Sequence, residues 1–182
     1  MSKQYLTVHT LDQSHPTDIF SLAPLLNAVV SASGSSSLQI NSTTDAEFPL
    51  QQTLSGAHKL GCHHLASSLD GKVLASAGFG GEVKIWTKVT EDEQGKGGQW
   101  DELGKLPVEG KVGEVWAISL GGDGRYLATS SYDGRICVWD LSPGPGGWVK
   151  AREYETKGSF GVCVAMVCDF LTCSIRRGER GT

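Results

Sequence analysis

Short runs in which apolar and polar residues alternate recur along the chain, and turns rich in glycine separate them. Alternation over about four to eight residues is typical of a half-buried β-strand. Asp133-Gly134 lies between two such runs, and this dipeptide in that position is a strong hairpin signal. The pattern predicts an all-β chain of short antiparallel strands. The predicted strands include residues 48–54, 72–76, 82–86, 100–108, 125–130, 135–140 and 148–155.

The strand pattern is repeated. A stretch that begins at Gly56 superposes without gaps on one that begins at Glu109, and Trp86 of the first falls on Trp139 of the second, 53 residues later. A weaker copy precedes them and has Asn41 at the tryptophan position. Each copy holds four predicted strands in roughly 40–45 residues plus insertions, which is the size of one blade of a β-propeller.

The repeat predicts three four-stranded blades, followed by one stub strand of a fourth blade and an irregular tail. Propellers close with about four to eight blades, so we expect a truncated chain with open sheet edges and marginal stability; a divergent fourth blade is the alternative. The predicted units are an N-terminal strand at 1–11, blade 1 at 12–55, blade 2 at 56–109, blade 3 at 110–156, the start of blade 4 at 157–166, and the tail at 167–182.

Composition excludes several classes of protein. Glycine makes up 24 of the 182 residues, about twice its average share, which disfavours a helical bundle because glycine favours turns. The net charge of −4 gives no basic footprint, so direct nucleic-acid binding is not predicted. The longest apolar-rich run, 160–173, is too short to span a bilayer, so no membrane segment is predicted.

The odd number of cysteines indicates reduced thiols. The first ten residues lack the apolar core of a signal peptide, and we therefore expect a soluble, cytoplasmic protein, with the nucleus as a further location. The cysteines are Cys62, Cys137, Cys163, Cys168 and Cys173.

No catalytic, cofactor or metal site is predicted. Cys62-His63-His64 has metal-binding residue types, but neighbours in a strand point to opposite faces, and the chain has no Cys-x-x-Cys pair. A Ser/His/Asp triad built on His58, His63 or His64 lacks a nucleophile elbow. The glycine clusters match neither a phosphate-binding loop nor a dinucleotide fingerprint.

His58, the Ser-Tyr-Asp-Gly turn at 131–134 and Val138-Trp139-Asp140 resemble the WD-repeat family. The sequences QYLTVHTLDQSHPTDIFSLA and AHKLGCHH resemble, more narrowly, the WD-repeat subunits of the superkiller complex of fungi. This resemblance implies a non-catalytic interaction scaffold for exosome-dependent cytoplasmic mRNA decay, with a role in meiotic recombination in some fungi. The implied partners are the tetratricopeptide scaffold and the RNA helicase of that complex. It also implies that the strand at 1–11 closes the propeller ring.

The WD-repeat family uses a hydrogen-bonded set of His, Ser or Thr, Asp and Trp in each blade. We expect this set to be incomplete in every copy, because Gly80 occupies the aspartate position of the second copy and Lys111 the histidine position of the third. Partial sets weaken such networks. The residues predicted to serve the set are His15, His58, Trp86, Asp133 and Trp139.

Equivalent positions of the three copies predict a partner-binding surface at one end of the blades. Aromatic residues are enriched there, which is typical of a binding hot spot. With its acidic residues, the surface fits a peptide that has an apolar anchor and an arginine, which Asp18 or Glu114 would bind. The alternative is that Phe79 and Trp116 pack between blades. The candidate residues are Asp18, Phe20, His63, Phe79, Glu114, Trp116 and Tyr132.

Three other functions stay open at this point. The chain is alternatively a WD-repeat adaptor of another complex, such as a ubiquitin ligase or a chromatin complex, or a truncated product without function. An enzyme would need a nucleophile and a base that converge, and the sequence shows no such pair.

Overall fold

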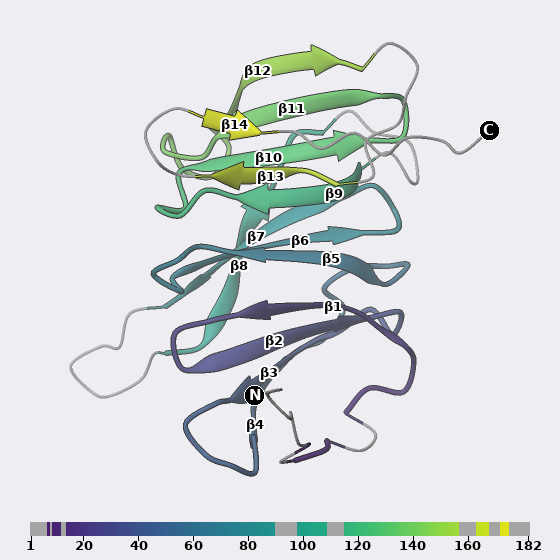
Figure 1. Ribbon diagram of the computed structural model, residues 1–182, viewed down its shortest axis with the longest axis vertical. Helices are drawn as coiled ribbons and strands as arrows, with labels where there is room; N and C mark the ends of the chain where they lie inside the picture. Colours follow the sequence, from purple (N-terminus) through teal and green to yellow (C-terminus); the bar gives the residue numbers. More distant parts are fainter. Residues whose placement is uncertain are drawn as a thin grey trace, which may run out of the picture.

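The computed structural model describes residues 7, 9–11, 14–89, 98–108, 115–156, 163–167 and 172–174. The regular elements in these ranges are all β-strands (Figure 1). Most of them form three four-stranded sheets, in each of which neighbouring strands are antiparallel and follow one another in sequence. The all-β prediction of three four-stranded blades is therefore confirmed.

The strand bounds follow the repeat. The first sheet consists of β1 (Ile19–Pro24), β2 (Ala28–Ser33), β3 (Leu38–Ser42) and β4 (Leu50–Leu54). The second consists of β5 (Cys62–Ser67), β6 (Val73–Gly78), β7 (Val83–Lys88) and β8 (Trp100–Lys105). The third consists of β9 (Val115–Leu120), β10 (Tyr126–Ser131), β11 (Arg135–Asp140) and β12 (Val149–Glu155).

The three sheets stack face to face, with β1, β5 and β9 as neighbouring first strands (Figure 1). Leu38, Ile40 and Trp86 belong to one apolar core, and Ile85 and Trp139 belong to another. Ile85 and Trp86 are adjacent in β7, so opposite faces of the second sheet contribute to the two cores, as strand alternation requires. Burial of both sheet faces stabilises the stack.

The start of a fourth unit packs on the third sheet. The antiparallel pair of β13 (Ala165–Val167) and β14 (Thr172–Ser174) lies beside β9, where the Met166 amide donates to Ser119 Oγ at 2.9 Å. The sequence predicted a single stub strand here. The structure has two strands, and β14 falls in the segment that was predicted to be an irregular tail.

The predicted N-terminal strand lies mostly outside the described residues. Of residues 1–11, the structure describes 7 and 9–11, and these are not in a strand. His9 stacks on Phe48 with 6.0 Å between the ring centroids, so this segment passes beside the β3–β4 connection. Ring closure by 1–11 stays a prediction.

Gln52 ties the outer strands of the first two sheets together. Its Nε2 donates to the Trp100 carbonyl at 2.8 Å, and its Oε1 accepts from the Trp100 amide at 2.7 Å. The side chain thus pairs with β8 as a neighbouring strand would, and it satisfies two backbone groups at a sheet edge.

Replacing Gln52 with alanine is expected to lower the free energy of unfolding by about 1–2 kcal/mol, because both Trp100 groups lose their partner. Urea melts monitored by circular dichroism measure the change. Gln51→Ala is the matched control, since Gln51 is exposed and adjacent. Equal stability of the two variants would show that the Gln52 bonds contribute nothing.

Candidate protein-interaction surface

A β-bulge lies near the start of each first strand, and each bulge contains one of the predicted surface residues. Ile19 pairs with Ser33 and Ser21 with Ala32, which leaves Phe20 as the extra residue. The register shifts in the same way around His63 of β5 and around Trp116 of β9. Bulges redirect side chains. The alternation expected for Cys62-His63-His64 therefore breaks at His63.

The bulges bring rings from three blades into one row. Phe79 follows β6, and its ring lies edge-on to Phe20 with 5.2 Å between the centroids. The His63 ring lies 4.9 Å from Phe79 and 6.2 Å from Trp116. Such contacts stabilise the arrangement by about 0.5–1.5 kcal/mol per aromatic pair. We call these four residues, Phe20, Phe79, His63 and Trp116, the aromatic surface.

His63 links the second blade to the third. Its Nε2–H donates to the Trp116 carbonyl at 3.0 Å, which fixes the tautomer when the ring is neutral. Burial lowers the pKa of His63, while the carbonyls of Trp116 and Val115 act in the opposite direction. The ring is therefore neutral near pH 7 and forms a fixed, uncharged part of the surface.

The outer members of the row are exposed to solvent. Phe20 is 51% exposed and Trp116 is 43% exposed, whereas Phe79 is half-buried between its neighbours. The alternative that Phe79 and Trp116 pack between blades therefore applies fully to Phe79. It applies only in part to Trp116, which lines the blade contact and also exposes part of its ring to solvent.

Glycines allow the blades to approach at this end. A Cβ on Gly61 would lie 2.8 Å from the Gly34 Cα, and Gly61 has a φ of +90°. The Phe79 amide donates to the Gly61 carbonyl at 3.1 Å. Glycine at both positions therefore lets the β2–β3 turn contact the start of β5, which positions Phe20 beside Phe79.

The remaining predicted surface residues are placed as follows. Asp18 is exposed next to the row, and its carbonyl accepts from the Gly34 amide at 3.3 Å. Tyr132 is 64% exposed in the β10–β11 turn. Glu114 lies outside the described residues. Sequence reasoning missed Leu60, which is 58% exposed at the same end; its position just before the Gly61 turn was the available signal.

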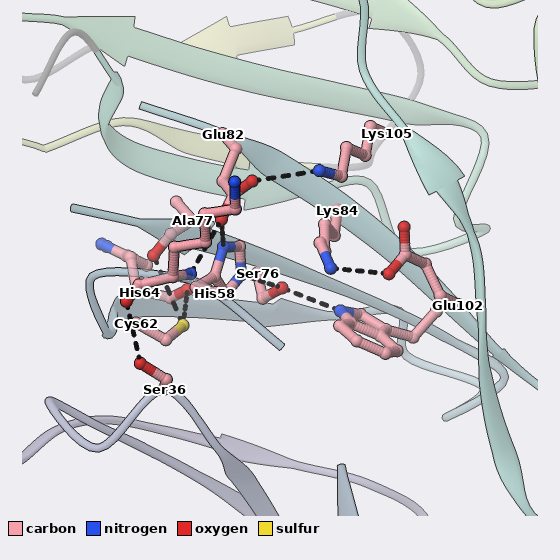
Figure 2. Close-up of polar contacts among 12 residues, drawn as sticks. Ser36, His58, Cys62, His64, Ser76, Ala77, Glu82, Lys84, Glu102 and Lys105 are labelled. Carbon is pink, nitrogen blue, oxygen red and sulfur yellow. Dashed lines mark hydrogen bonds and ion pairs between the residues drawn. The ribbon is translucent and has the colours of Figure 1, made fainter. Parts of the chain in front are cut away.

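Beneath this end, the second blade contains a continuous hydrogen-bonded network (Figure 2). Trp86 Nε1 donates to Ser76 Oγ at 2.8 Å, and Ser76 Oγ lies 2.8 Å from His58 Nε2. His58 Nδ1 lies 3.1 Å from Glu82 Oε1. Since the carboxylate accepts a hydrogen bond from Nδ1–H, Nε2 accepts a hydrogen bond from the serine hydroxyl.

The expectation that the hydrogen-bonded set of His, Ser or Thr, Asp and Trp is incomplete in every copy is wrong for the second blade. Gly80 occupies the aspartate position, but Glu82 follows two residues later and supplies the carboxylate instead. Glu82 also bonds Lys105 Nζ at 3.2 Å. Burial opposes ionisation of Glu82, yet the contacts with Lys105 and His58 hold its pKa below the usual value. The second blade therefore has all four groups.

His58 is fully buried and uncharged. Burial lowers its pKa to about 4, although Glu82 acts in the opposite direction. A second ion pair lies nearby, where Lys84 Nζ contacts Glu102 Oε2 at 2.6 Å (Figure 2). Lys84 is 7% exposed, and pairing offsets the cost of burying its charge.

The first blade satisfies its histidine differently. His15 Nε2 lies 2.7 Å from Ser31 Oγ, and His15 Nδ1 lies 2.9 Å from Ser33 Oγ. Asn41, at the tryptophan position, donates to the Phe48 carbonyl at 2.9 Å instead of to the serine.

In the third blade, Trp139 Nε1 donates to Thr129 Oγ1 at 3.2 Å. Asp133 accepts from Ser131 Oγ and from the Arg135 amide, so it stabilises its own turn. Lys111, at the histidine position, lies outside the described residues.

The residues of Cys62-His63-His64 do not converge. Cys62 Sγ donates to the Ala77 carbonyl at 3.3 Å, and burial raises its pKa to about 12, so the thiol stays protonated. His63 bonds the Trp116 carbonyl. Over the described ranges, no group of three or more His, Cys, Asp or Glu residues is arranged to hold a metal ion. Within the same ranges, no helix is long and apolar enough to span a membrane.

Comparison with known sequences connects this geometry to a family. The profile described as "WD domain, G-beta repeat" matches residues 48–87 and 103–140. These two segments are similar to WD repeats. The first match runs from β4 through β7, so the sequence repeat takes its outer strand from one blade and its three inner strands from the next. The chain forms three blades of a partial WD40 β-propeller.

Several curated proteins are similar to the chain. "Meiotic recombination protein rec14" of Schizosaccharomyces pombe is 38% identical over 164 residues, which cover 90% of this chain and 50% of that protein. "Probable cytosolic iron-sulfur protein assembly protein 1" of Malassezia globosa is 32% identical over 100 residues, which cover 53% of this chain and 28% of that protein. The chain thus spans at most half the length of these relatives.

Proposed function

We propose that this WD-repeat chain is a non-catalytic scaffold that binds segments of partner proteins on its aromatic surface. The observation that supports this proposal is the bulge in three successive blades at Phe20, His63 and Trp116. Bulges are over-represented beside functional sites because they redirect side chains. Here they produce one row of rings at the end of the stack.

The surface fits a peptide with an apolar anchor and a basic residue. Phe20, Trp116 and Tyr132 offer exposed aromatic area at a low cost in conformational entropy, which favours hot-spot contacts. Asp18 supplies a carboxylate beside the row for an arginine, and Glu114 is the second candidate by sequence.

The contacts of the buried histidines support a non-catalytic role. Both ring nitrogens of His58 are engaged, by Ser76 and Glu82, and the ring is fully buried. His15 is similarly enclosed by Ser31 and Ser33. Histidines held in this way stabilise the blades and lie out of reach of a substrate.

For the complex served, we propose the superkiller type, with partners that include a tetratricopeptide scaffold and an RNA helicase, and a second role in meiotic recombination. The resemblance of the N-terminal sequence supports the first role. The name of the rec14 relative, which aligns over 90% of the chain, supports the second. We propose a cytoplasmic location, which agrees with the word "cytosolic" in the name of the Malassezia relative, and a nuclear fraction for the second role.

The double variant Trp116→Ala/Tyr132→Ala is expected to weaken partner binding at least about tenfold, since it removes two exposed rings. Fluorescence anisotropy measures this with a labelled peptide that contains an arginine next to an apolar anchor residue, and with a matched peptide in which Glu replaces the arginine. Leu103→Ala is the control, because Leu103 is 39% exposed on the outer strand β8. Unchanged affinity of the double variant for the arginine peptide would refute the proposal.

A further inference from the structure

The end of the blades opposite the aromatic surface carries two leucines that sequence reasoning did not single out. Leu69 is 85% exposed in the β5–β6 turn, and Leu26 is 77% exposed in the β1–β2 turn. These are the highest exposed fractions among the exposed large hydrophobic side chains of the described residues. Isolated exposed leucines are ordinary, but these two lie on turns of neighbouring blades at the same end.

Contacts between blades hold these turns side by side. Ser67 Oγ donates to the Pro24 carbonyl at 2.6 Å, and a Cβ on Gly71 would lie 2.8 Å from the Leu26 amide nitrogen. On the other side, the Leu69 amide donates to the Gly122 carbonyl of the β9–β10 turn at 2.9 Å. The turns that carry the leucines are therefore held in place, and a ligand that binds there need not order their backbone.

The charge around the leucines is predominantly negative. The Thr43 amide donates to the Asn27 carbonyl at 3.0 Å, which places the β3–β4 connection beside Leu26. Asp45 and Glu47 are exposed in that connection. Asp70 and Asp123 are exposed in the next two turns. The cations of these turns, Lys72 and Arg125, already pair with Asp70 at 3.6 Å and with Asp140 at 3.1 Å.

We propose that Leu26, Leu69 and the acidic residues around them form a second docking surface, which binds a basic amphipathic segment of a partner protein. Two apolar residues on one face of the segment would cover the leucines, while Lys or Arg beside them would meet Asp45, Glu47 and Asp123. Charge complementarity selects a basic segment over an acidic one. A scaffold with binding surfaces at both ends of its blades can hold two partners at once.

Anisotropy measurements with the full chain and a labelled helical peptide, leucine on one face and lysine on its flanks, test the proposal. Leu26→Ser/Leu69→Ser is expected to weaken binding at least about tenfold. The two side chains are largely exposed, so the melting temperature should be unchanged. Glu47→Gln/Asp123→Asn is expected to weaken binding at low salt and to reduce its salt dependence.

Two controls separate this surface from the aromatic one. Trp116→Ala/Tyr132→Ala is expected to retain affinity for the basic peptide. Failure of the leucine surface can therefore be distinguished from failure of the aromatic surface. A matched peptide with glutamate in place of lysine is expected to bind at least about tenfold more weakly. Unchanged affinity of Leu26→Ser/Leu69→Ser for the basic peptide, or equal binding of the acidic and basic peptides, would overturn the proposal.

Discussion

Acidification from pH 7 to pH 4 is expected to lower the free energy of unfolding by about 3 kcal/mol through His58 alone. Burial lowers the pKa of this ring from 6.5 to about 4 in the folded chain, against the effect of Glu82. As the pH falls below 6.5, His58 becomes protonated in the unfolded chain but stays neutral in the folded chain. Stability is therefore lost between pH 6.5 and 4, and the contribution becomes constant below that window.

Urea melts of the chain and of His58→Gln at several pH values measure this effect. The variant is less stable at pH 7, because Ser76 and Glu82 lose their partner, but its stability falls less steeply between pH 6.5 and 4. Burial also lowers the pKa values of His15 and His63, so a smaller slope remains. His9→Gln, on a histidine of the N-terminal segment, is the control. An identical slope in the parent chain and in His58→Gln would contradict the assignment.

The blade architecture could be predicted because it is local. Each hairpin depends on a turn such as Asp133-Gly134 and on alternation over a few residues, and the constant offset between Trp86 and Trp139 shows that the unit repeats. The structure has the corresponding strands paired in meanders. The fourth unit was predicted less well, since β14 has neither a turn signal nor alternation before it.

The network of the second blade could not be predicted by alignment alone. The family pattern places the carboxylate at the position of Gly80. A position-by-position alignment therefore does not test whether Glu82, two residues later, supplies this carboxylate. The longer side chain of glutamate still reaches His58 from just before β7, and its pairing with Lys105 joins this position to β8, which a linear pattern does not relate to it. Conversely, Asp133 occupies the expected position and bonds within its own turn.

The aromatic surface was predicted as a set of equivalent positions but not as a geometry. The aligned positions of Phe20, His63 and Trp116 gave their common location, since equivalent residues of stacked blades lie at the same end. The bulges that redirect them depend on one extra residue in the strand register, which apolar alternation does not reveal. Register is a property of strand pairs, and one strand read alone cannot specify it.

Gly78→Ala is expected to lower the free energy of unfolding by about 3 kcal/mol, from overpacking and lost hydrogen bonds. A Cβ at this position would lie 2.4 Å from His58 Nδ1 and 2.7 Å from its Cγ. The ring is fully buried, so it can move only by giving up Glu82 and Ser76. Urea melts give the value, and Gly80→Ala, where a Cβ would meet no atom within 4 Å, is the matched control.

A double-mutant cycle with His58→Ala identifies the cause. Without the imidazole ring, Gly78→Ala should cost less than about 1 kcal/mol, since residues in contact couple and the contact is gone. The first blade explains why glycine is needed only here: Ser33, at the position of Gly78, bonds His15 Nδ1 directly from the strand. In the second blade, Glu82 reaches His58 from beyond the turn, so the ring lies over residue 78. An equal cost of Gly78→Ala in both backgrounds would mean that the glycine serves the backbone and not the ring.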